Sequence, residues 1–98
     1  MIVEHALLQV KPDQADRFAR AMQQAKPLIA AQPGFQSIEV RPSTEVPGQY
    51  LMLVQWDSVV SHRDGFRKSP EYEQWRALLH GFYDFIPTVT YYGPSIIL

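Results

Sequence analysis

Three histidines are the residues of this sequence best suited to acid–base chemistry near neutral pH. The chain has no cysteine, so His5, His62 and His80 carry the side chains whose ordinary pKa lies close to neutrality. His5 stands inside an apolar run that extends from Ile2 to Val10, where a buried imidazole would need a polar partner. We therefore predict that His5 is a catalytic base in a binding pocket. The alternative is a core or edge histidine with a structural partner.

Five further side chains are predicted to line a ligand-binding pocket. His62 follows an apolar strand and could orient a substrate oxygen or cap local backbone. His80 lies near the end of the last helix, where a cation also interacts well with the helix dipole. Tyr72 and Tyr83 are separated by about three helical turns, so they could form an aromatic slot for a planar ligand or pack against the sheet. Trp56 is either a pocket wall or a core residue.

The sequence predicts no metal site, because the spacings between the histidines match no local ligand motif and no Glu-x-x-His pair accompanies them. It also has no nucleophile motif, no glycine-rich phosphate loop and no paired catalytic carboxylates. Arg63, Arg67 and Lys68 form a small basic cluster, which we interpret as a solvated helix face.

Length and charge narrow the possible partners. The chain has 98 residues, which predicts one domain over residues 1–98 with its core at about 2–92. The formal net charge is −1 and basic residues form no stripe, so nucleic-acid binding is not expected. No segment approaches the roughly 20 apolar residues of a membrane span, and the first residues do not read as a secretion signal. We therefore expect no membrane association and a cytoplasmic location.

Periodicity and turn signals predict an α+β chain with six main elements. These are strand 2–10, a helix from Pro12 that Pro27 should kink or split, strand 35–41, strand 49–56, a helical region 58–82 that restarts at Ser69-Pro70, and strand 88–92. Strand 49–56 is the most apolar and should be central. The order β-α-β-β-α-β is that of a ferredoxin-like fold with a four-stranded antiparallel sheet.

A sheet covered by helices on one side has a second face, and here that face must also be apolar. Leu7 and Leu8 point to opposite sides of their strand, and Leu53 and Val54 do the same in the most apolar one. Exposed apolar faces of this extent usually mark an interface. We therefore predict a homodimer through the sheet face. The tail 93–98 would then lie either on the partner or on its own subunit.

Several motifs along the chain point to a known family. They are the first strand running into Lys11-Pro12 with Phe18 beyond it, Pro33-Gly34-Phe35, Trp56-Asp-Ser-Val-Val-Ser-His62 with Gly65-Phe66-Arg67-Lys-Ser69, then Tyr72 and Trp75, and finally Pro87-Thr-Val89 before Tyr91-Tyr92. Through them the chain resembles the antibiotic biosynthesis monooxygenase (ABM) family of the dimeric α/β-barrel superfamily, over nearly its whole length.

This resemblance implies a dimeric α/β barrel with a pocket between the sheet and the helices. It implies a cofactor-independent monooxygenase that uses dioxygen as co-substrate and acts on an aromatic phenol, quinol or polyketide-like small molecule. The alternative is a non-catalytic ligand-binding or stress-associated homodimer, since fold does not fix function. Relatives that degrade haem use an asparagine, a tryptophan and a histidine, and the matching positions hold His5, Gly65 or Phe66, and Arg76. Haem degradation is therefore disfavoured.

Overall fold

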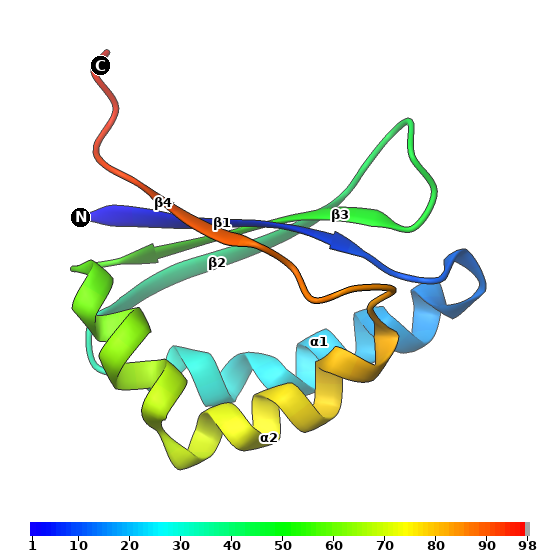
Figure 1. The fold of residues 1–98 in the computed structure, drawn as a ribbon, viewed down its shortest axis with the longest axis horizontal. Coiled ribbons are helices and arrows are strands. Elements are labelled where there is room, and N and C mark those ends of the chain that lie inside the picture. Colours follow the sequence, from blue (N-terminus) through cyan, green and yellow to red (C-terminus); the bar gives the residue numbers. More distant parts are fainter. Residues whose placement is uncertain (98) are drawn as a thin grey trace.

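The computed structural model describes residues 1–97, in which two helices cover one face of a four-stranded sheet (Figure 1). The main elements are β1 (Ile2–Gln9), α1 (Ala15–Ala30), β2 (Phe35–Pro42), β3 (Gln49–Trp56), α2 (Pro70–Leu79) and β4 (Val89–Tyr92). Short helical turns span Pro12–Gln14, Ser61–Gly65, Phe66–Lys68 and His80–Phe82. The predicted order of an α+β ferredoxin-like fold is thereby confirmed.

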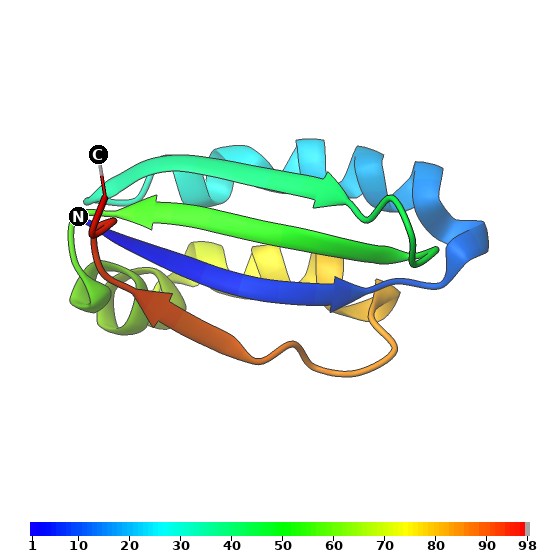
Figure 2. The same ribbon diagram turned by 90° about the horizontal axis from the view of Figure 1, so that it is seen from above.

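The strand order is β2-β3-β1-β4, so β3 is central, as predicted, and β1 is the other central strand (Figure 2). All neighbouring strands are antiparallel, and His5 stands opposite Leu53 of β3 and Thr90 of β4. Successive side chains of a strand point to opposite faces of the sheet. Even-numbered residues of β1 and β3 face the helices, as their burial shows, and odd-numbered residues face away.

The hydrophobic core lies between the sheet and the helices. The strands contribute their helix-facing side chains, and the helices contribute residues at helical spacing. The largest fully buried side chains are Trp56, Phe18, Phe66, Leu8, Ile29, Leu79, Val10 and Val54. Trp56 at the end of β3 is thus a core residue rather than an exposed pocket wall.

Helix boundaries follow from local sequence, with one exception. Ser69 caps α2, because its hydroxyl accepts a hydrogen bond from the Tyr72 backbone N–H at 3.2 Å and Pro70 occupies the first turn. Pro27 was predicted to kink or split its helix, and the split is not seen, since α1 stays helical to Ala30. A proline removes one backbone donor. Both Pro27 and Gln23, whose carbonyl loses its usual partner, are exposed, so water can replace the missing bond.

The second face of the sheet carries apolar side chains that nothing in residues 1–97 buries fully. Leu7 and Tyr92 are exposed, and Leu51 and Leu53 are only half-buried. The tail after β4 rises from the sheet on the side opposite the helices (Figure 1), and Ile96 within it is 100% exposed. Over residues 93–97 the tail therefore does not pack on its own subunit; Leu98 lies outside the described residues.

Candidate active site

A cavity of about 350 Å³ lies between the helix-facing side of the sheet and α2. This volume is within the range of small-molecule sites. Its floor is formed by β1, β3 and β4, and its walls are largely aromatic, including Phe66, Tyr72 and Trp75. The polar side chains that line it are Glu4, His62, Arg67, Tyr72, Arg76, His80 and Tyr83.

Glu4 is a buried carboxyl at the floor of this cavity. It lies in the middle of the sheet, in step with the core residues Ala6 and Leu8, and is 3% exposed. Its Oε1 accepts a hydrogen bond of 2.9 Å from Nε1 of Trp56. Burial raises the pKa of Glu4 to about 7, against the smaller lowering effects of the Trp56 hydrogen bond and the Arg67 charge. Glu4 can therefore exchange a proton near neutral pH.

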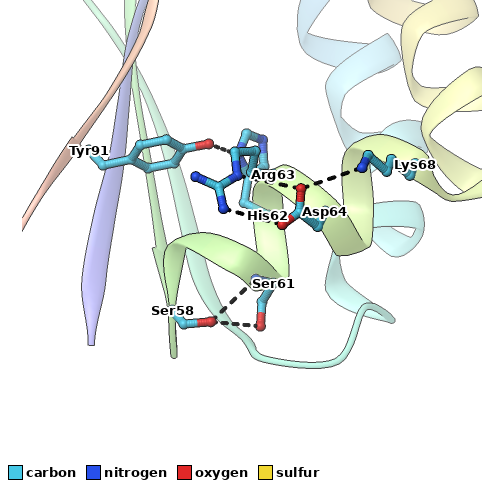
Figure 3. Close-up of polar contacts among 7 residues, drawn as sticks. All are labelled: Ser58, Ser61, His62, Arg63, Asp64, Lys68 and Tyr91. Atoms are coloured by element: carbon cyan, nitrogen blue, oxygen red, sulfur yellow. Dashed lines mark hydrogen bonds and ion pairs between the residues drawn. The ribbon is translucent and has the colours of Figure 1, made fainter.

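His62 connects Glu4 to the edge strand. It is 3% exposed and points inward from the helical turn Ser61–Gly65, so that Nε2 lies 3.4 Å from Oε2 of Glu4. Its Nδ1 lies 2.6 Å from the hydroxyl of Tyr91 on β4 (Figure 3). Burial lowers the pKa of His62 to about 4, and the nearby Arg67 charge acts in the same direction. The raised pKa of Glu4 and the lowered pKa of His62 both favour the neutral forms of the two side chains in this buried position.

Local hydrogen bonds fix the turn that carries His62. The Ser61 backbone N–H donates to Oγ of Ser58 at 3.3 Å, and the Ser61 hydroxyl donates to Asp57 at 2.5 Å. One turn further, the Asp64 carboxylate forms ion pairs with the Arg63 guanidinium at 3.3 Å and with Nζ of Lys68 at 3.6 Å (Figure 3). The segment is thus fastened on its outer side, which leaves its inner side to present His62.

The opposite wall combines two tyrosines with His80. Ring centroids lie 5.5 Å apart for His80 and Tyr83, and 6.4 Å apart for Tyr72 and His80. The sequence expectation of one continuous helix was wrong here, because α2 ends at Leu79 and Tyr83 follows the turn His80–Phe82 with extended backbone. That turn nevertheless brings both tyrosines to the cavity. Burial raises the pKa of Tyr83 above its ordinary range and lowers that of His80.

The structure brings most of the predicted binding residues together and separates His5 from them. His62, Tyr72, His80 and Tyr83 all line the cavity, whereas Trp56 lies behind Glu4 and holds it. The sequence placed His5 in this pocket, but its side chain lies on the opposite face of the sheet. There it packs edge-on against Tyr92, with ring centroids 5.7 Å apart, beside the Thr90 hydroxyl at 3.5 Å.

Three side chains of the site were missed by sequence reasoning: Glu4, Arg67 and Tyr91. A signal for Glu4 was present, because a carboxylate in step with alternate apolar residues marks a charge on the buried face of a strand. Arg67 and Tyr91 carried no comparable signal, since a surface arginine and an edge-strand tyrosine are ordinary residues at such positions.

Residues 1–97 show neither a cluster of metal ligands nor a membrane-spanning helix. Residues 1–97 contain no group of three or more His, Asp or Glu side chains placed to hold a metal ion. No helix within the same range is long and apolar enough to cross a membrane.

The chain is similar in sequence and in structure to known proteins. The family model described as antibiotic biosynthesis monooxygenase matches residues 1–78. The chain is 38% identical to the uncharacterized protein YczJ of Bacillus subtilis over 92 residues, which cover 94% of this chain and 97% of YczJ. A Bordetella bronchiseptica structure, provisionally assigned as an antibiotic biosynthesis monooxygenase, is 28% identical with a TM-score of 0.92 and covers 97% of both chains. A conserved protein of Methanosarcina mazei shares the fold at 22% identity and a TM-score of 0.82, over 96% of this chain and 92% of that one.

Proposed function

The chain belongs to the antibiotic biosynthesis monooxygenase family, and on this basis we propose that it is a cofactor-independent monooxygenase. Its substrate would be a small phenol, quinol or polyketide-like aromatic bound in the cavity between the sheet and α2. One observation carries the proposal: Glu4 faces this cavity as a buried carboxyl whose pKa is raised to about 7. A general base is most effective when its pKa lies near the working pH.

Glu4 would start the reaction by taking the proton of a phenolic hydroxyl. The resulting phenolate is electron-rich and reduces dioxygen directly, so that the ring carbon para to the oxygen forms a bond to one oxygen atom. Glu4 returns its proton to the outer oxygen, which gives a hydroperoxide. Loss of water, with the hydrogen of that ring carbon, leaves a quinone. Phenol and dioxygen thus give quinone and water, and no separate reductant is consumed.

The neighbours of Glu4 support this role. Trp56 fixes one carboxyl oxygen by donating a hydrogen bond, and neutral His62 lies beside the other. The Tyr91 hydroxyl contacts the second nitrogen of His62 and so fixes the orientation of the ring. A base held by its own packing and hydrogen bonds keeps the geometry that proton transfer needs.

Oxygen uptake is the direct test. Metal-free protein would be mixed with 1-naphthol and with a panel of dihydroxynaphthalenes and quinols, and compared with buffer to subtract autoxidation. For 1-naphthol we expect one dioxygen consumed for each 1,4-naphthoquinone formed, with loss of this activity in Glu4→Gln. Tight binding without oxygen uptake would contradict the proposal and favour the ligand-binding homodimer instead.

We also propose that two copies pair through the face of the sheet that bears Leu7, Leu51 and Leu53. Burying roughly 700 Å² of apolar surface on each subunit would contribute about 15–20 kcal/mol per subunit before the cost of association is subtracted. The tail leaves the sheet on the same side as this face and carries the exposed Ile96 and Ile97, and we propose that it lies on the partner. Sedimentation equilibrium at micromolar concentration should give twice the chain mass of 11.3 kDa. A monomer under these conditions would contradict the pairing.

A further inference from the structure

Arg67 stands out among the basic residues near the cavity. The sequence grouped it with Arg63 and Lys68 as one solvated cluster, but the structure separates the three. Arg63 and Lys68 both pair with Asp64 on the outer side of the turn (Figure 3). Arg67 lines the cavity instead, and its guanidinium lies 5.8 Å from the centre of the Tyr72 ring.

No carboxylate within residues 1–97 is paired with the positive charge of Arg67. Arg76, the other arginine of the cavity, pairs with Glu73 at 2.8 Å. Within residues 1–97 Arg67 makes no ion pair, although its charge is felt by Glu4 and His62. Among the described residues, Glu4 is the one carboxyl that lines the cavity, and it is already engaged by Trp56 and His62. The wall around Arg67 therefore offers an unmatched cation.

We propose that Arg67 binds an acidic substituent on an aromatic ligand, so that the cavity selects hydroxylated aromatic acids over neutral phenols. The inference rests on the proposed function in taking the ligand to be a hydroxylated aromatic. Phe66, Tyr72 and Trp75 supply the flat apolar walls for the rings. A guanidinium can hold a carboxylate through two parallel charge-assisted hydrogen bonds, which adds orientation to affinity.

In this arrangement Arg67 and Glu4 would contact different groups of the same ligand. Arg67 holds the acidic group near the mouth, because its side chain is exposed, whereas Glu4 lies at the buried floor. A ligand anchored by Arg67 would therefore present its phenolic hydroxyl to Glu4. The proposed dimer interface uses the opposite face of the sheet, so it leaves this cavity open to ligands.

Matched probes test the proposal by binding alone. The probes are 6-hydroxy-2-naphthoate, whose hydroxyl and carboxylate lie at opposite ends of the ring system, and the neutral amide of the same shape, 6-hydroxy-2-naphthamide, titrated without oxygen into the full-length protein by calorimetry. We expect the native protein to prefer the carboxylate by at least tenfold. Arg67→Met should abolish this preference and leave the amide affinity within about twofold. Arg63→Met, which removes a charge that does not line the cavity, should retain it.

Other outcomes would overturn the inference. Equal affinity of the native protein for the two probes would do so, as would the absence of binding by both. An equal loss of affinity for both probes in Arg67→Met would show that Arg67 is only a wall for the rings. The proposed function has a separate test. A preference for the carboxylate without oxygen uptake by any substrate would contradict the monooxygenase activity but would still support anion binding by Arg67.

Discussion

Glu4 and His5 are neighbours in the sequence but belong to opposite faces of one strand. Glu4 faces the helices at the floor of the cavity, where burial raises its pKa to about 7. His5 faces away, half-buried beside Tyr92 and Thr90. By residue type the histidine is the better candidate for neutral-pH chemistry, but the carboxyl is the one that faces the cavity. The side of the strand, rather than the kind of side chain, therefore decides which of the two residues can meet a ligand there.

The same division extends over the whole sheet. The helix-facing side encloses the core and the cavity, and its buried polar atoms are satisfied within the protein, since no buried side-chain nitrogen or oxygen in residues 1–97 lacks a partner. The other side is apolar but incompletely covered, which suits contact with a second subunit. One face would thus serve chemistry and the other assembly.

The largest expected effect comes from placing a charge on each face in turn. Val54 is 0% exposed in the core, so Val54→Asp should unfold the protein, at a cost of several kcal/mol for an unpaired buried charge. Leu53→Asp places the same charge on the other face and should leave the subunit folded but monomeric. Circular dichroism and sedimentation distinguish the two outcomes. If Leu53→Asp stayed dimeric, the assembly role of that face would be lost.

The next effect contrasts the two adjacent candidates for the base. Glu4→Gln keeps the Trp56 hydrogen bond but cannot take a proton, so oxygen uptake should fall by about a hundredfold or more. His5→Gln, on the other face, should change the rate by no more than about threefold. Both variants should melt within a few degrees of the native protein. The reverse ranking would return the catalytic role to His5, as the sequence alone suggested.

Much of the fold could be predicted because its signals are local. Alternating apolar residues delimited β3 to the residue, and the Ser69-Pro70 pair located the start of α2. The unbroken α1 was not foreseen, because tolerance of Pro27 depends on that side of the helix being exposed. The end of α2 at Leu79 also followed from packing rather than from a clear stop signal.

The site was less predictable because its contacts are long-range. His62, Tyr72, His80 and Tyr83 could be named from residue type, and they do line one cavity. No local pattern could pair Glu4 with His62 and Tyr91, which come from three separate parts of the chain. The tertiary fold decides whether the even-numbered or the odd-numbered residues of β1 face the helices. The even-numbered residues do so here, and Glu4 therefore lines the cavity whereas His5 does not.

The smallest expected effect is a pH dependence of stability that only the cavity side should show. Folding raises the pKa of Glu4 from 4.5 to about 7, so the folded state holds a proton that the unfolded chain releases, and stability falls as pH rises through this window. Folding lowers the pKa of His62 from 6.5 to about 4, so stability rises with pH over nearly the same window. In the native protein the two contributions should largely cancel between pH 4.5 and 6.5.

Removing one member of this pair should expose the other. In Glu4→Gln only the His62 contribution remains, so the free energy of unfolding relative to the native protein should increase from pH 4.5 to 6.5, with a slope of up to about 1.4 kcal/mol per pH unit. His5→Gln should run parallel to the native protein, because His5 is not part of this pair. Urea denaturation at several pH values measures the free energy of unfolding of each variant relative to the native protein. Ionisable groups that all three proteins share contribute equally and cancel in these differences. A flat difference for Glu4→Gln would mean that folding does not lower the pKa of His62, and the contrast between the two faces would then rest on the oxygen-uptake and assembly experiments.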